Sequence, residues 1–457
     1  METNMTTGRP LSLMLRFMIP LLFGNIFQQL YNMVDTIIVG RFVGSDALAA
    51  VGATGTVFFM IMGTCNGMAT GFTVLTSQKY GADDKEGTKY SFTNGFMLSV
   101  ILIILMTVLT LTLMHPILHM MNTPEDIYDN SYAYISTICM GLFSIVLSNL
   151  FASFLRAIGN SRVPLIALIS SAIINIGLDL LFIIVFNMGV AGAAWATNIA
   201  QAIAALICLI YIIKKVDVLR PSRSHWHFKK EFVRKQLGIG VPMSLQFGIT
   251  ASGTMVMQTA INKFGSVAVT GFTAASKVQG LLTQGMMAIG QTCAAFAGQN
   301  FGKRDIARVH QGTKDAMKIS VAYSIVTGAI GIPLLPFLMG IFFDGDVDIT
   351  PYMPYAKEYF YMCVATYLTL CMIFIYRNTL QGCGFGFVAM SLGGVELVTR
   401  LVAAGLSMYL GSYTLAAAAD PGTWLVTGIF AFILYLSMRK KMLKLFPPST
   451  DTVGGKS

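Results

Sequence analysis

Twelve apolar stretches dominate this sequence, and each one is long enough to cross a membrane as a helix. The hydrocarbon core of a bilayer is about 30 Å thick and needs about 20 helical residues. The stretches fall at residues 13–38, 48–76, 91–115, 131–155, 163–186, 190–213, 238–262, 268–298, 316–343, 356–381, 386–410 and 423–439. Only 11% of the residues are charged, against about a quarter in soluble domains. We therefore predict an all-α integral membrane protein with twelve transmembrane helices.

Basic residues collect at alternate junctions between these stretches. The longest basic segment, "KKVDVLRPSRSHWHFKKEFVRK", follows the sixth stretch, and Lys303, Arg304 and Arg308 follow the eighth. The junctions between the basic ones are acidic or neutral, such as "NTPEDIYDN" and "FDGDVD". By the positive-inside rule, both termini are expected in the cytoplasm of a cell whose plasma membrane holds the protein. The net charge of +10 is then explained by loops facing anionic lipid, and nucleic acid is not expected as a partner.

The basic segment divides the chain into two similar halves. We predict an amino-terminal lobe at 1–213, a cytoplasmic linker at 214–236 and a carboxy-terminal lobe at 237–457. "SQKYGADDKEGTK" in the first half matches "GQNFGKRDIARVH" in the second, and "FLRAIGNSRVP" matches "TLQGCGFGFVA", at a nearly constant offset along the chain. Each half holds six spans, so the repeat is parallel and predicts two pseudo-symmetric six-helix lobes. This arrangement is typical of alternating-access transporters.

Three acidic residues lie well inside the predicted spans, where each costs about 2.5–3.5 kcal/mol to insert, and a fourth, Glu358, lies near the start of its span. Asp179 has Asn175 four residues earlier on the same helix face. The directions of the spans place Asp35, Asp179 and Thr197 at similar depths, within about two helical turns. Carboxylate, amide and hydroxyl oxygens suit a proton or Na⁺. We predict a cation site at Asp35, Asn175, Asp179 and Thr197, although Thr197 alone would equally suit a helix–helix contact.

The third acid, Glu396, precedes Arg400 by four residues, in the favourable orientation for a pair on one helix. Lys277 and Arg377 also lie in second-half spans. We favour a neutralised structural network of Glu396 with Arg400, Lys277 and Arg377, with a second coupling site as the alternative.

The first span carries a polar stripe formed by Asn25, Gln28 and Asn32, which recur at helical spacing. We expect this stripe to face a water-filled cleft and to contact substrate. Pro20 interrupts the same span and permits a kink. The kink is either static or a hinge that bends when Asp35 changes charge, and the sequence leaves both interpretations open.

The remaining sequence features argue against cofactor chemistry. None of the seven cysteines forms a C-x-x-C pair, so we expect buried thiols rather than disulfides or a metal centre. No phosphate-binding loop is present, so we expect no ATP site, no other cofactor and a driving force from an ion gradient. The five histidines lie at span ends or in loops, which disfavours an intramembrane enzyme.

These motifs together resemble the multidrug and toxin extrusion (MATE) family over nearly the whole chain. They are "IPLLFGNIFQQLYNMVDTIIVG", "FLRAIGNSRVP", "INIGLDLLF" and "GVAGAAWATNIAQ". The resemblance implies export of organic, often cationic and amphipathic compounds, coupled to inward H⁺ or Na⁺. By residue match it implies ion binding at Asp35, Asn175, Asp179 and Thr197.

The resemblance is to the DinF-like rather than the NorM-like branch, because Thr250 stands near the position of a NorM-like glutamate. The predicted function is thus cation-coupled multidrug efflux by antiport, with the protein acting as a monomer. The alternatives are a flippase for lipid-linked precursors and, less favoured, an intramembrane enzyme.

Overall fold

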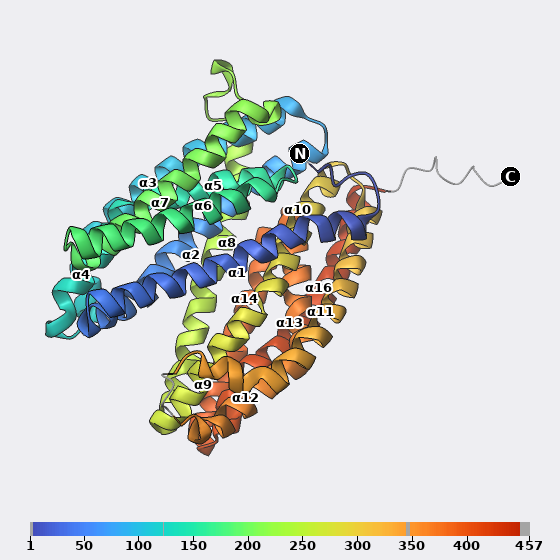
Figure 1. Ribbon diagram of the computed structural model, residues 1–457. Helices are drawn as coiled ribbons and strands as arrows, with labels where there is room; N and C mark the ends of the chain where they lie inside the picture. The colour runs from blue at the N-terminus through green and yellow to red at the C-terminus, as the bar shows by residue number, and fades with distance from the viewer. Residues whose placement is uncertain (1–2, 122, 344–347, 448–457) are drawn as a thin grey trace. The chain divides into compact units, whose positions relative to one another are not determined.

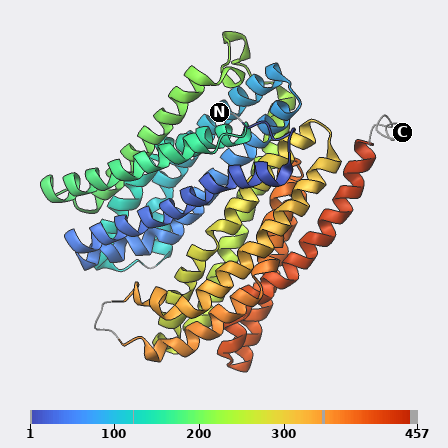
Figure 2. The same ribbon diagram turned by 45° about the vertical axis from the view of Figure 1, so that its right-hand side comes forward.

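The computed structural model describes residues 3–121, 123–343 and 348–447, and these residues are almost entirely helical. They form two compact units. Unit 1 comprises Thr3 and Ile19–Gly248, and unit 2 comprises Asn4–Met18 and the described residues from Ile249 onward. The predicted lobe boundaries at 213 and 237 stay predictions. Figures 1 and 2 show each unit as a bundle of long helices joined by short turns.

The helices of unit 1 follow the predicted spans closely but extend beyond them. They are α1 (Pro10–Phe42, from Ile19 onward), α2 (Ser45–Gly81), α3 (Lys85–Met120), α4 (Glu125–Met140), α5 (Leu142–Ala157), α6 (Arg162–Leu180) with the π-helical η1 (Leu181–Val185), α7 (Gly189–Lys215) and the start of α8 (Lys230–Asn262). The short 3₁₀ turns η2 (Asp217–Leu219) and η3 (Arg223–His225) lie between α7 and α8.

Unit 2 contains the rest of α1 and α8 and the helices that follow. These are α9 (Gly265–Leu282), α10 (Gln284–Gly302), α11 (Ile306–Gly340), the 3₁₀ turn η4 (Thr350–Tyr352), α12 (Met353–Ala365), α13 (Tyr367–Gly382), α14 (Gly386–Leu410), α15 (Tyr413–Ala417) and α16 (Ala419–Leu445). Most of the acidic junction predicted at 343–348 lies outside the described residues.

Eight of the described helices are long and apolar enough to cross a membrane, and two bent helix pairs raise the number to ten. The other two predicted spans, 238–262 and 268–298, are helical as α8 and as α9 with α10, but they are not among these ten. Large apolar side chains face outward along the spans. On α3, for example, Ile101, Ile104, Leu105 and Val108 are each more than half exposed, as expected for a lipid-facing stripe.

Two spans that the sequence predicts as continuous are bent. α4 and α5 meet at 48°, and α12 and α13 meet at 52°. The first bend has a visible cause, because Asn198 of α7 donates a hydrogen bond to the Thr137 carbonyl at 2.7 Å. A side chain that inserts into the helical hydrogen-bond ladder kinks the helix. A Cβ atom on Gly141 would lie 1.9 Å from Asn198 Cγ, so this bend also requires glycine.

The two halves repeat the same local backbone features. Gly159, between α5 and α6, has φ +84°, and Gly384, between α13 and α14, has φ +87°. Asp84 caps α3 and Asp305 caps α11, each accepting a hydrogen bond from the backbone N–H three residues later. Both pairs keep the offset that relates the matching motifs of the two halves. The structure therefore confirms the internal repeat predicted from the sequence.

The linker between the halves is docked on unit 1. His225 is buried, and its Nε2 lies 2.8 Å from the Glu86 carboxylate on α3. The His225 carbonyl accepts a hydrogen bond from Thr93 at 2.9 Å, and the Lys229 N–H donates to Asn94 at 2.9 Å. These contacts fix the chain just before α8 begins.

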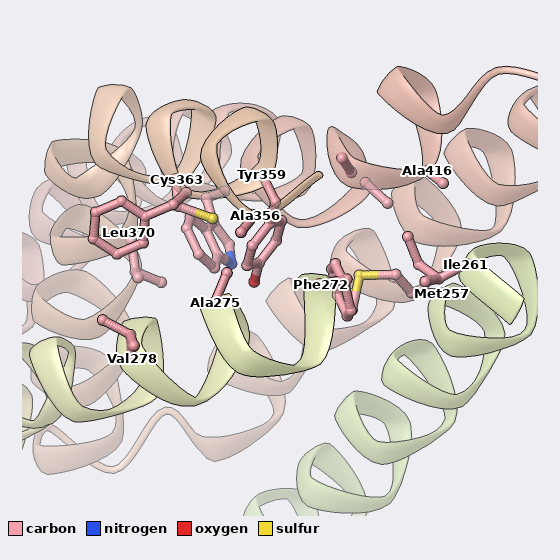
Figure 3. Packing of buried hydrophobic residues seen from close by; sticks show 14 of the residues in the cluster. Met257, Ile261, Phe272, Ala275, Val278, Ala356, Tyr359, Cys363, Leu370 and Ala416 are labelled. Carbon is pink, nitrogen blue, oxygen red and sulfur yellow. The ribbon is translucent and has the colours of Figure 1, made fainter. Parts of the chain in front are cut away.

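The hydrophobic core of unit 2 packs α9 against α12. Figure 3 shows Phe272 and Ala275 of α9 facing Tyr359 and Cys363 of α12. The rings of Phe272 and Tyr359 are 4.5 Å apart. All seven cysteines of the chain are buried and reduced, which agrees with the expectation of buried thiols.

Within unit 1, α2 and α8 approach too closely for side chains at the contact. A Cβ atom on Gly71 would lie 2.4 Å from Gly240 Cα, and backbone cannot move aside as a side chain can. We expect Gly71→Ala to lower the free energy of unfolding by about 1–3 kcal/mol through overpacking, measured by thermal or denaturant unfolding in detergent.

The control is Gly55→Ala in the same helix, where nothing lies within 4 Å of the added atom. Alanine is the better helix former by about 1 kcal/mol, so this variant should be neutral or slightly stabilised. Equal destabilisation by both variants would contradict the close α2–α8 contact.

Candidate cation site

The four predicted cation ligands come together in unit 1, where α1, α6 and α7 meet. Asn175 and Asp179 project from one face of α6 and have no exposed surface. Thr197 lies two turns into α7 and is half-buried, as is Asp35 near the end of α1. The structure therefore places all four side chains in one region, as the depth argument from the sequence predicted.

Hydrogen bonds connect these side chains. Asn175 Nδ2 donates to Thr197 Oγ1 at 3.4 Å, and the Tyr31 hydroxyl lies 3.3 Å from the same oxygen. The carboxyl groups of Asp35 and Asp179 hydrogen-bond to each other. A hydrogen bond between two carboxyl groups needs an O–H donor, so in this arrangement the pair holds a proton.

The arrangement can exchange that proton for another cation. If the proton leaves, two carboxylates face each other in a largely dry environment and repel. A monovalent cation such as Na⁺ would relieve that repulsion, and the amide of Asn175 and the hydroxyl of Thr197 supply further oxygen ligands. A hydrogen-bonded acid pair with neutral oxygen neighbours is therefore suited to bind and release one positive charge.

The backbone beside the site is irregular. α6 passes directly into the π-helical turn η1 after Leu180, so Asp179 lies next to the change of helix type. Single π-helical turns inside α-helices occur frequently at functional sites. Nothing in the sequence indicated this turn, because "LFIIV" is an ordinary apolar run.

Two tyrosines complete the surroundings of the site and were not singled out from the sequence. Tyr31 is buried and contacts Thr197, and Tyr134 of α4 is buried within electrostatic range of Asp35 and Asp179. Tyr31 could have been found, because it precedes Asp35 by one helical turn. Tyr134 lies on a different helix, and no spacing in the sequence connects it to the acids.

The polar stripe on α1 lies N-terminal to this site. Asn25 and Gln28 are half-buried and Asn32 is exposed. Gln28 donates a hydrogen bond to Asn32 at 3.2 Å, which confirms that these residues share one helix face. Pro20 sits inside α1, and the helix continues through it without a break.

Unit 2 contains a buried network of charged side chains around Glu396. Arg377 Nη1 lies 3.2 Å from Glu396 Oε1, and Arg400 Nη1 lies 3.8 Å from Glu396 Oε2. Arg400 Nε donates to Asp420 Oδ1 at 2.9 Å. Asp420 was missed because its segment, "YTLAAAADPG", was interpreted as a junction between spans. In the structure, Asp420 lies in the first turn of α16.

Lys277 does not take part in the contacts that the structure gives this network. Its side chain is exposed, and its Nζ lies 5.4 Å from the ring centre of Phe342. The geometry therefore joins Glu396 to Arg400 and Arg377 as expected. It leaves Lys277 out and adds Asp420. A lysine in an apolar span can satisfy its charge at the helix surface, where its long stem reaches polar surroundings.

Thr197→Val should destabilise the cation site. It removes the oxygen that both Tyr31 and Asn175 contact, and removing a partner of buried polar groups costs about 1–3 kcal/mol. Thr197→Ser keeps the oxygen and is the matched control. Unfolding measurements in detergent should show a clear decrease in the free energy of unfolding for Thr197→Val and a small decrease for Thr197→Ser. Equal decreases would contradict the hydrogen bonds to Thr197.

Glu396→Gln should destabilise unit 2 by about 3–5 kcal/mol, because it leaves a buried positive charge without its partner. Lys277→Met removes a charge that lies outside the network and should change the free energy of unfolding little. A large effect of Lys277→Met in the same assay would show that Lys277 belongs to the network after all.

Comparisons with known proteins show which family the chain resembles. A model of the MatE family matches residues 20–181 and again residues 242–406. A probable multidrug resistance protein of Bacillus subtilis, YpnP, is 29% identical over 315 residues, which cover 67% of this chain and 68% of that protein. The multidrug export protein MepA of Staphylococcus saprophyticus is 27% identical over 266 residues, covering 57% of each chain.

The fold is also shared with solved structures. One, described as the outward-facing conformation of a multidrug resistance MATE family transporter, superimposes with a TM-score of 0.90 at 22% identity. The alignment covers 96% of this chain and 98% of that one. At this identity the likeness establishes the two-lobed helical fold, while the two family matches establish descent. The chain belongs to the MatE, or multidrug and toxin extrusion, family and is a multi-pass membrane transporter rather than an enzyme.

Proposed function

We propose that this protein exports small organic compounds, often cationic and amphipathic, across the plasma membrane in exchange for H⁺ or Na⁺. The names of its relatives, a probable multidrug resistance protein and a multidrug export protein, support the substrate class. The hydrogen-bonded carboxyl pair of the half-buried Asp35 and the buried Asp179 is the observation that supports ion coupling.

The coupling follows from the cost of charge inside a membrane. With both carboxylates ionised and no cation present, the site carries two negative charges among apolar helices, which is strongly unfavourable. One bound cation lowers this cost, so a conformation that binds the cation well is favoured when the ion is abundant. Coupling requires only that ion and drug prefer different conformations.

The proposed cycle begins in an outward-open state that has brought a drug from the cytoplasm. A proton or Na⁺ enters from outside and binds at Asp35 and Asp179, and this favours drug release and return to the inward-open state. Asn175 and Thr197 orient the acid pair through their mutual hydrogen bond. The ion then leaves into the cytoplasm, and the next drug molecule binds from that side.

α1 is the element best placed to transmit the change. It carries Asp35, the stripe of Asn25, Gln28 and Asn32, and Pro20. Proline removes one hydrogen bond from a helix and lowers the cost of bending there. We propose that the stripe contacts the drug and that α1 bends at Pro20 when the charge on Asp35 changes.

We also propose the membrane orientation and the oligomeric state that the sequence predicts. Both termini face the cytoplasm, the apolar outer surfaces contact lipid, and the protein acts as a monomer. The first lobe carries the coupling, as in the DinF-like branch of the family.

Asp35→Asn or Asp179→Asn should abolish drug export while leaving the amount of folded protein unchanged. Either change removes one of the two carboxyl groups that together hold the cation, so binding and release of the ion no longer accompany transport. Resistance and dye-efflux assays in a drug-sensitive host, with protein quantified in the membrane, would measure this. Asp126→Asn alters an exposed acid at the start of α4 and should leave export normal. Normal resistance in either site variant would refute the coupling role.

Reconstituted vesicles with an imposed pH gradient or an imposed Na⁺ gradient would identify the ion. We expect one of the two gradients to drive drug uptake into inverted vesicles, and the Asp35→Asn protein to respond to neither. Drug movement of equal rate without any gradient would contradict antiport.

A further inference from the structure

The internal repeat identifies which residue of unit 2 corresponds to Asn175 in the proposed ion site of unit 1. Gly159 before α6 and Gly384 before α14 share the left-handed backbone and mark equivalent positions. The end of η1, which continues α6, and the end of α14 are separated by the same offset as these two glycines. That offset, applied to Asn175, leads to Arg400.

Arg400 brings a positive charge to the position where unit 1 has an uncharged amide. Its Nε donates to Asp420 at 2.9 Å, and its Nη1 lies 3.8 Å from Glu396. Both acids are at least nine-tenths buried. Arg377 contacts the other oxygen of Glu396 at 3.2 Å, and Thr250 donates to Glu396 at 3.5 Å.

The space for this guanidinium comes from a second residue difference between equivalent positions of the two halves. Pro20 inside α1 and Pro242 inside α8 mark equivalent positions, and their offset, applied to Tyr31, leads to Gly253. A Cβ atom on Gly253 would lie 3.1 Å from Arg400 Cδ and 3.3 Å from its Nη1. Unit 1 thus combines a large side chain on α1 with a short amide on α6. Unit 2 combines glycine on α8 with a long arginine on α14.

We propose that Arg400 is a tethered cation that occupies the unit 2 counterpart of the ion site. A guanidinium is permanently charged and cannot leave, so it satisfies the buried acids in every step of transport. Unit 2 therefore takes up no mobile cation, and ion coupling is confined to unit 1. The confinement of ion coupling to unit 1 rests on the proposed function, whereas the occupancy of the site by Arg400 does not.

The charges of the unit 2 network support this assignment. Two carboxylates, Glu396 and Asp420, face two guanidiniums, so the cluster is neutral without any added ion. The other titratable groups acting on it are Tyr359 and Cys363 of α12, which are uncharged in their ordinary protonated forms. Removing the charge of Arg400 leaves two acids with one guanidinium. An uncompensated buried carboxylate then requires a proton or a metal cation.

The test uses the full-length protein in detergent and starts from an Asp35→Asn/Asp179→Asn background, in which both carboxyl groups of the proposed unit 1 site are removed. The probes are radioactive Na⁺ at alkaline pH and, in Na⁺-free buffer, proton uptake followed by an indicator dye. We expect the background protein to bind neither cation at the network. Adding Arg400→Gln should create binding of a single cation per chain, and further adding Glu396→Gln should remove it.

Arg400→Lys is the matched control, since it keeps a positive charge and should create no cation binding. The proposal would be overturned if Arg400→Gln created no cation binding, or if Arg400→Lys created as much cation binding as Arg400→Gln. If Arg400→Gln and the longer apolar variant Arg400→Met fold poorly, high Na⁺ or low pH should restore the folded yield, because a ligand stabilises the state that binds it. No recovery under either condition would also overturn it.

Failure of the proposed function gives a different result. If the Asp35→Asn/Asp179→Asn protein binds as much cation as the unaltered chain, the unit 1 site is refuted. The gain caused by Arg400→Gln and its loss with Glu396→Gln still report on Arg400 alone.

Discussion

The hydrogen-bonded carboxyl pair of Asp35 and Asp179 is the interaction on which the proposed ion coupling of this protein depends. Charge is costly among apolar helices, and two carboxyl groups in contact cannot both remain ionised without a cation between or beside them. The surrounding helices hold the two acids together. Asn175 and Thr197 fix the orientation of α6 relative to α7, and Tyr31 extends the hydrogen-bonded group to α1. Neutral hydrogen bonds thus hold in place the helices that carry the proposed ion site.

Holding these helices in place requires that they pack with almost no space between them. In unit 1, α2 and α8 are in backbone contact at Gly71 and Gly240. Asn198 of α7 donates a hydrogen bond to a backbone carbonyl of α4. Without a hydrophobic driving force between helices in lipid, association depends on close packing and interhelical hydrogen bonds. Small residues at these contacts supply the first, and buried amides and hydroxyls supply the second.

The two halves share a backbone plan but differ in chemistry at one position. Asn175 and Arg400 occupy equivalent places on α6 and α14, and the differences at Tyr31 and Gly253 adjust the available volume. A buried charge is tolerated when it is paired and hydrogen-bonded, and Arg400 meets both conditions through Asp420 and Glu396. A duplicated fold can thus keep one half responsive to an ion and make the other half self-neutralising.

The sequence by itself determined the helical membrane fold, the repeat and the placing of the two candidate ligands on one face of α6. Apolar length and the four-residue spacing of Asn175 and Asp179 are local properties, so hydropathy and helical periodicity are enough to find them. Only the tertiary structure showed the bends at Gly141 and Thr366. The first bend depends on the side chain that α7 inserts there, which no local pattern reveals. The tertiary structure also joined Asp35 to Asp179, brought Tyr134 to the site and moved Lys277 away from Glu396, since contacts between distant segments depend on how whole helices pack.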